Sequence, residues 1–417
     1  MDAARMIEER VGGDIAELAS MVDPDQEGWS RVALTEVDVE GRQWALKQFR
    51  RLGLDARIDP AGNVIGCLQG AIGGRSIMVG SHVDTVPGGG RFDGIVGVVG
   101  AIELVRQLQE SSTRLDHDLY IVVFFSEEPN RFGLSCIGSR ALTGALTFEH
   151  LQADDGDGMS FGNALAGARI DASKILTSAW DWSTVDAFLE LHIEQGPLLE
   201  ELGAEIGLVE KITGLSRFRT LFTGQADHAG TAAMDRRHDA GCAAAGTVLA
   251  VERIASAGKN ARGTVGGVHF TPEAVNVVNA RAEIRGEFRS PDGDWLKEAE
   301  EALTGAAARE AAARGVTVEL DWLPTQEPQP MGSEVVEVVG RAVDELGLSR
   351  VAMFSGAEHD AALIARRAPT AMLFIPSVGG RSHCPEEFTE LPDIVRGVRA
   401  LVRSVMMIDN TVVTANR

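Results

Sequence analysis

The 417-residue sequence is poor in cysteine, in basic residues and in long apolar runs, and each shortage excludes a class of protein. Its four cysteines, Cys67, Cys136, Cys242 and Cys384, stand far apart without a spacing pattern, which indicates reduced thiols rather than a disulfide framework. No stretch approaches the roughly 20 consecutive apolar residues of a transmembrane helix. Residues 1–13 contain no apolar signal region, and we therefore expect a cytoplasmic protein.

Acidic residues outnumber basic ones by 61 to 39, so the formal net charge at pH 7 is −22. Nucleic acid and anionic membranes need a basic surface, and we do not expect either as a partner. A small anionic substrate stays compatible with this charge, because a local arginine can outweigh the average. The hydrophobic content of 44% is that of a soluble globular protein, and the length predicts two domains.

The segment Gly80–Pro87 (GSHVDTVP) ends a short apolar run and carries the first chemical signal. In a strand, where side chains alternate, His82 and Asp84 point to the same side of the strand end. A neutral imidazole is a good metal ligand, and a nearby carboxylate can hold its tautomer. Asp93 follows just before a helical pattern over residues 94–109, where a carboxylate could bridge two ions. By itself, a His-x-Asp pair is more often structural.

Further acids and histidines stand at the edges of other apolar runs. Glu127 and Glu128 follow the run 119–125, and adjacent acids after a strand point different ways, so one can bind metal while the other carries a proton. His192 lies within an apolar stretch, and His383 lies near the C-terminus. Together these residues are what a two-metal hydrolase needs. The alternative is a set of unrelated core histidines and solvated acids.

These segments resemble the M20 family of metal-dependent amidohydrolases, and within it the hydantoinase/carbamoylase branch. The matching motifs occur in the same order as in the family: DPAGN (59–63), GSHVDTV (80–86), FDG (92–94), EE-x-x-RF (127–132), ELHIEQGP (190–197), DHAGT (227–231), SGAEHDA (355–361) and SH-x-P-E (382–386). The resemblance runs from about residue 25 to beyond residue 390. ELHIEQGP separates this branch from the peptidases and aminoacylases of the wider family.

The order of helical and strand-like patterns predicts an α/β fold. Up to about Gly207 they alternate, which favours a largely parallel sheet covered on both faces. From about Thr213 to Pro328 the order is β-α-β-β-α-β, typical of a ferredoxin-like α+β sandwich. We therefore predict a catalytic, metal-binding domain of residues 1–212 and 329–417 and an inserted domain of residues 213–328. The resemblance implies that the insertion serves as lid and dimerisation domain.

The resemblance also implies two divalent metal ions per subunit. One ion would be held by His82, Asp93 and His192, and the other by Asp93, Glu128 and His383. Two carboxylates and three neutral imidazoles leave two dications with a net positive charge, ready to polarise a carbonyl. Zinc suits these nitrogen and oxygen ligands, and manganese, cobalt or nickel are also compatible.

Glu127 matches the family's catalytic glutamate. As a general base it would take a proton from the bridging water and deliver it to the leaving nitrogen. Asp84 would orient His82. Without the resemblance, Glu127 could be an ordinary surface acid.

The substrate-binding residues rest on the resemblance alone. Arg289 would grip a substrate carboxylate with its paired donors, and Asn276 would help at the same end. His228 would stabilise the developing oxyanion, often in the neighbouring subunit's active site. Further candidates are Gln195 and the backbone of Gly356 and Ala357. The sequence departs from the family pattern at Glu358, where a small residue is usual, and at Asn279, where proline is common.

The activity that the resemblance implies is hydrolysis of a non-peptide C–N bond. We expect the carbamoyl group of an N-carbamoyl-L-amino acid as its target, with amino acid, CO2 and NH3 as products. The open alternatives are an allantoate- or ureidoglycolate-type ureide hydrolase, an N-acyl amino acid amidase, and a catalytically silent two-domain binding protein. The expected partners are a small carboxylate-bearing substrate and a second copy of the chain, because an unpaired strand edge in residues 213–328 can pair with its two-fold mate.

Overall fold

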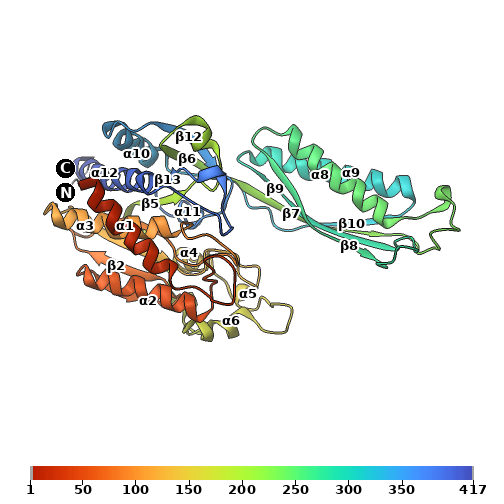
Figure 1. Ribbon diagram of the computed structural model, residues 1–417, viewed down its shortest axis with the longest axis horizontal. Coiled ribbons are helices and arrows are strands. Elements are labelled where there is room, and N and C mark those ends of the chain that lie inside the picture. The colour runs from red at the N-terminus through yellow and green to blue at the C-terminus, as the bar shows by residue number, and fades with distance from the viewer. Residues whose placement is uncertain (1–2, 416–417) are drawn as a thin grey trace. The chain divides into compact units, whose positions relative to one another are not determined.

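The computed structural model describes residues 3–415, which form two compact units (Figure 1). Unit 1 contains the chain up to Glu210, residues 330–353 and the chain from Glu358 onward. Unit 2 contains Lys211–Gln329 and Phe354–Ala357, so the predicted insertion of residues 213–328 lies inside it. Within the described residues, no helix is both long and apolar enough to cross a membrane.

A nine-stranded mixed sheet forms the framework of unit 1. The strand order is β1-β2-β4-β3-β5-β13-β6-β11, and β12 pairs with β6. The four central strands β4, β3, β5 and β13 run parallel, whereas β1, β2 and β6 pair antiparallel with their neighbours. This confirms the predicted α/β class with a mostly parallel centre. The strands are β1 (Asp55–Ile58), β2 (Val64–Leu68), β3 (Ser76–His82), β4 (Asp118–Phe124), β5 (Val185–Ile193), β6 (Ile206–Ile212), β11 (Gln329–Pro330), β12 (Arg350–Ser355) and β13 (Thr370–Ile375).

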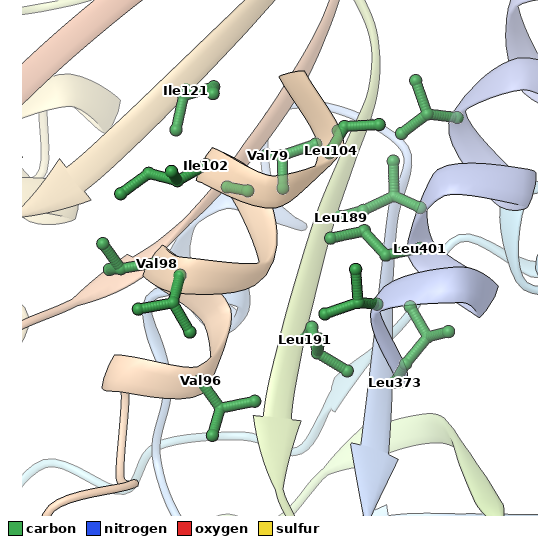
Figure 2. Close-up of a cluster of buried hydrophobic side chains, with 14 of the residues drawn as sticks. Val79, Val96, Val98, Ile102, Leu104, Ile121, Leu189, Leu191, Leu373 and Leu401 are labelled. Atoms are coloured by element: carbon green, nitrogen blue, oxygen red, sulfur yellow. The ribbon is translucent and has the colours of Figure 1, made fainter. Parts of the chain in front are cut away.

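One face of this sheet carries the main apolar core. Figure 2 shows Val79 of β3 and Leu189 of β5 in the same cluster as Leu401 of the C-terminal helix. Strand side chains alternate between faces, so His82 and His192, each three residues further along, fall on the opposite face. The helices that contribute to the core are α1 (Ala3–Ala19), α2 (Glu36–Arg51), α3 (Ile95–Glu110), α10 (Ser333–Glu345) and α12 (Leu391–Ala415).

Helix α2 begins at Glu36 because a side chain just before it caps its first turn. The side chain of Thr35 accepts a hydrogen bond from the N–H of Asp38 and so caps the helix at Glu36. The short helices of unit 1 are α4 (Ile137–Thr143), α5 (Phe148–Leu151), α6 (Phe161–Ala164), α7 (Leu198–Leu202), α11 (Asp360–Ile364), η1 (Leu165–Ala168), η2 (Ile175–Thr177), η3 (Trp182–Thr184) and η5 (Val378–Gly380).

Unit 2 has the predicted β-α-β-β-α-β order. Its antiparallel sheet runs β10-β7-β9-β8, and helices α8 and α9 cover one face (Figure 1). Along β9, buried Ala282, Ile284 and Phe288 alternate with more exposed charged residues. The elements are β7 (Gly214–Thr223), η4 (Met234–Arg236), α8 (Ala240–Ala257), β8 (Arg262–Thr271), β9 (Arg281–Ser290), α9 (Gly293–Arg314) and β10 (Thr317–Trp322).

Candidate metal centre

Three imidazoles converge on the carboxylate of Asp93. Its Oδ1 lies 3.0 Å from Nε2 of His192 and 3.8 Å from Nε2 of His82. Its Oδ2 lies 3.2 Å from Nε2 of His383, which in turn lies 3.3 Å from Oε1 of Glu128. Two groups of possible ligands, each with its donor atoms within 4.8 Å, therefore share Asp93. They are the two sets predicted for the two ions; that they bind metal stays a prediction.

The parallel sheet explains why residues so distant in sequence meet. His82 is the last residue of β3, and His192 is the penultimate residue of β5. Asp93, Glu128 and His383 lie on loops that follow β3, β4 and β13. Because the carboxyl ends of parallel strands meet at one edge, these loops and strand ends come together there, where ligands bind in α/β proteins.

Strained backbone marks the same edge. Ser126, Cys136, Gln195 and His383 adopt left-handed conformations, with φ of 51°, 52°, 58° and 56°. Such a conformation costs a non-glycine residue about 1–3 kcal/mol and persists where the surroundings hold it. Ser126 directly precedes the two glutamates, and His383 is itself a predicted ligand. The strain therefore lies in the segments that present the polar groups.

The electrostatics of the site suit cations. Burial lowers the pKa of His82 to about 4, so its imidazole is neutral and able to bind metal. Burial works against the charge of Asp93, but hydrogen bonds with His192 and His383 hold the pKa of Asp93 well below its ordinary value. Three imidazoles and two carboxylates are nitrogen and oxygen ligands of the kind that zinc, manganese, cobalt and nickel take. The residues therefore fit two divalent ions.

Glu127 lies beside both ligand groups. Its side chain is buried, with Oε2 3.6 Å from Nε2 of His82 and Oε1 3.7 Å from Sγ of Cys136. Burial, followed by the nearby charges of Glu128 and Asp360, raises the pKa of Glu127 well above its ordinary value. A carboxylate with a raised pKa is suited to accept and return a proton.

Asp84 contacts this site in an unexpected way. Its main-chain oxygen, rather than its carboxylate, lies 3.0 Å from Nδ1 of His82, and the nearest carboxylate oxygen is 3.8 Å from that nitrogen. The carboxylate accepts hydrogen bonds from the backbone N–H groups of Glu127 and Glu128, at 3.2 and 3.1 Å. Asp84 therefore holds the turn that carries the two glutamates.

The sequence reasoning missed two buried carboxylates near the ligands. Glu190 on β5 accepts hydrogen bonds from Oγ of Ser81 and the N–H of Ala361, and burial raises its pKa to about 7. Glu387 accepts hydrogen bonds from the backbone of the Asp93 loop. An acid inside an apolar strand is a signal that could have revealed Glu190. Glu387 follows Glu386 of the SH-x-P-E motif, and nothing in the neighbouring sequence distinguishes it from a surface acid.

Of the residues predicted to bind substrate, only Gln195 belongs to unit 1. Its Nε2 lies 2.7 Å from Oδ2 of Asp93 and 3.3 Å from Nε2 of His383, so it contacts the candidate metal ligands directly. The unusual Glu358 also belongs to unit 1. Its carboxylate accepts a hydrogen bond from Ser135 at 3.1 Å and lies 3.5 Å from Arg140.

The other predicted substrate residues lie in unit 2, at opposite ends of its sheet. His228 and Asn276 are adjacent, because the N–H of Ala229 donates to the carbonyl of Asn276 at 2.9 Å. Arg289 stands near the far end of β9, where it contacts Glu287 at 2.7 Å and the carbonyl of Gly356 at 2.9 Å. At about 3.3 Å per strand residue, β9 alone separates the two ends by roughly 26 Å. Ala357 follows Gly356 in the same unit.

The chain matches known proteins over nearly its whole length. It is 35% identical to a ureidoglycolate hydrolase of Oryza sativa subsp. japonica, over 93% of this chain and 82% of the relative. It is 33% identical to an N-carbamoyl-L-amino acid amidohydrolase of Geobacillus stearothermophilus, over 95% and 97%. A crystal structure of AtUAH in complex with (S)-hydroxyglycine superimposes with a TM-score of 0.85 at 34% identity, over 97% of this chain and 98% of that one.

A family model gives the same result as these pairwise similarities. Residues 78–407 match the model of peptidase family M20/M25/M40, and they include every predicted metal ligand. The resemblance read from the motifs is thereby confirmed. The chain belongs to peptidase family M20/M25/M40.

Proposed function

We propose that the protein hydrolyses the carbamoyl C–N bond of an N-carbamoyl-L-amino acid, giving the amino acid, CO2 and NH3. The observation that carries this proposal is the pair of ligand groups that share Asp93, with Glu127 beside them. The relative from Geobacillus stearothermophilus, whose name states this activity, supports a non-peptide C–N bond as the target.

Ureidoglycolate is the second candidate substrate, favoured by the similarity to the rice ureidoglycolate hydrolase. Chemically it is the N-carbamoyl derivative of hydroxyglycine, the molecule bound in the similar AtUAH structure. It therefore presents the same scissile bond and the same carboxylate as an N-carbamoyl amino acid. The two candidates differ only in whether a hydroxyl group or a carbon side chain stands on the α-carbon.

The chain's own residues account for the proton transfers. Two divalent ions, when bound by the two ligand groups, would polarise the ureido carbonyl and acidify water. Glu127 accepts a proton as water oxygen attacks the carbamoyl carbon, and returns it to the nitrogen as the C–N bond breaks. Asp84 keeps the Glu127–Glu128 turn in place through its two backbone hydrogen bonds. Arg289, held by Glu287 and Gly356, presents a cation to the substrate carboxylate.

Release of the free amino acid from a substrate panel, with ammonia measured alongside for the ureido compounds, tests the proposal, because hydrolysis of an N-acetyl compound yields acetate and no ammonia. The metal-replete protein should turn over N-carbamoyl-L-amino acids with a kcat/KM at least about 100-fold above that for the matching N-acetyl compounds, because only the ureido group offers the second nitrogen. Preference for ureidoglycolate would favour the second candidate, and preference for N-acetyl substrates would indicate an amidase. Tight binding of one panel member without any turnover would identify a silent binding protein.

We further propose that the active enzyme is a homodimer joined through unit 2. Strand β8 is an edge of the smaller sheet, and it carries the exposed apolar side chains of Val268 and Phe270. An unpaired edge can pair with its two-fold mate. A small ureido acid is much shorter than the roughly 26 Å that separate Arg289 from the His228–Asn276 end. If both ends contact one substrate molecule, they must come from two copies of the chain.

Mixed dimers distinguish a shared site from a self-contained one. After subunit exchange between inactive Glu127→Gln and His228→Ala proteins, a shared site leaves one intact active site in each mixed dimer. Activity should then return to about a quarter of the wild-type value, because random exchange makes half of the dimers mixed. Recovery is measured as ammonia release, and exchange is verified with differently tagged subunits. No recovery despite complete exchange would show that His228 does not act across the interface.

A further inference from the structure

The carboxylate of Glu387 forms hydrogen bonds with both of the loops that carry the predicted metal ligands Asp93 and His383. Glu387 is 2% exposed, and its Oε1 accepts hydrogen bonds from the N–H groups of Phe92 and Asp93, at 3.0 and 3.1 Å. Its Oε2 accepts a hydrogen bond from Oγ of Ser382 at 2.6 Å. The same hydroxyl lies 3.3 Å from Oδ2 of Asp93. Three donors from the two loops thus meet on one buried carboxylate.

The chain leaves space for this carboxylate at Gly90. A Cβ atom built there would overlap the carboxyl group and Cβ of Glu387, and these are the three nearest atoms to that position. The φ of Gly90 lies outside the left-handed region, so alanine could adopt its backbone conformation. Glycine at this position is therefore explained by the room that Glu387 needs.

The position of the His383 side chain depends on these hydrogen bonds more than the positions of the other two imidazoles do. His82 and His192 stand on hydrogen-bonded strands of the central sheet. His383 lies on a loop beyond β13, has a strained φ of 56°, and its side chain is 47% exposed. The ring of Phe388 packs edge-on against Phe92 at 5.5 Å, which keeps the two loops adjacent but does not orient the polar groups.

We propose that Glu387 is a positioning residue that sets the distance between Asp93 and His383, and thereby the affinity of the ion held by Asp93, Glu128 and His383. The inference rests on the proposed metal-dependent function. It assigns Glu387 no contact with substrate. Residues behind metal ligands typically change metal affinity by 10–100-fold when they are replaced.

Stepwise titration of the metal-free, full-length protein with Co2+, followed by calorimetry and by the visible absorption of the bound ion, tests this role. The binding step that His383→Ala removes identifies the ion in question. Glu387→Ala should weaken that step by about 10–100-fold and the other step by less than about threefold. Exposed Glu386, which pairs with Arg381 at 2.9 Å, supplies the matched control, and Glu386→Ala should change neither step.

Two more variants separate position from charge and from folding. Glu387→Gln keeps an oxygen that accepts from the two N–H groups, and its amide N–H can donate to Oγ of Ser382 in place of the present hydrogen bond, so it should restore most of the affinity. Gly90→Ala should reproduce the Glu387→Ala defect by displacing an intact carboxylate. In the double variant, Gly90→Ala should add little, because its steric conflict is with Glu387. Circular dichroism and gel filtration verify that each variant is folded.

The possible results are distinguishable. Glu387→Gln as defective as Glu387→Ala would indicate a role of charge and overturn the positioning role, as would equal weakening of both steps. Normal affinities in Glu387→Ala would also overturn it, while leaving the proposed function intact. If the wild-type protein takes up no Co2+, the metal-dependent function fails, and this inference fails with it.

Discussion

Asp93→Ala is expected to leave subunits without firmly bound metal and to reduce kcat/KM by at least about 10^4-fold, the equivalent of several kcal/mol of lost stabilisation of the transition state. The two ligand groups that contain Asp93 have no other residue in common. Three imidazole nitrogens lie within 3.8 Å of the Asp93 carboxylate. Its removal therefore disables both groups together. Elemental analysis after gel filtration, together with ammonia release, measures the two effects.

Glu128→Ala provides the comparison within the site. Glu128 belongs only to the group with His383, so this variant should keep one ion per subunit. Asp157→Ala, in an exposed acidic loop, should keep two ions and full activity. Two firmly bound ions in Asp93→Ala would contradict the bridging role.

Glu127→Gln is expected to keep both ions while kcat falls by roughly 10^2–10^4-fold, the usual contribution of a general acid–base. The amide has nearly the same shape as the carboxylate, so the contacts with His82 and Cys136 leave room for it. It cannot take a proton from water. Steady-state kinetics at saturating substrate and metal analysis on the same preparation separate the two properties.

An altered ion count distinguishes a ligand from a base. Loss of one ion in Glu127→Gln would make Glu127 a ligand, and near-normal kcat would remove it as the base. Glu128→Gln, a change at the neighbouring residue, should instead weaken metal binding.

Local patterns were sufficient to predict the strand that presents His82. The apolar run ending near His82 is a strand because buried parallel strands read as continuous apolar segments. In β9, apolar and charged residues alternate over residues 281–289, because one face of the strand is buried under two helices. These features depend on residues that are close together in the sequence, so a local pattern of apolar and polar residues can predict them.

Contacts between distant segments were not predictable in this way. Asp84 and His82 are two residues apart, yet the carboxylate of Asp84 turns to the backbone of Glu127 and Glu128 on the next parallel strand's loop. Glu387 meets the N–H of Asp93 across 294 residues of chain. Neither contact leaves a periodic signal in the sequence, because a backbone N–H can donate a hydrogen bond whatever side chain its residue carries.

The sequence by itself determined the α/β class and the β-α-β-β-α-β insertion, and it supplied the residue types that a two-metal site needs, because hydrophobic period and motif spacing are local properties. Tertiary structure alone decided which groups meet. Parallel pairing of β4, β3, β5 and β13 brings the five predicted ligands from separate segments to one edge. The length of β9 separates Arg289 from His228 and Asn276, since each residue of an extended strand advances about 3.3 Å.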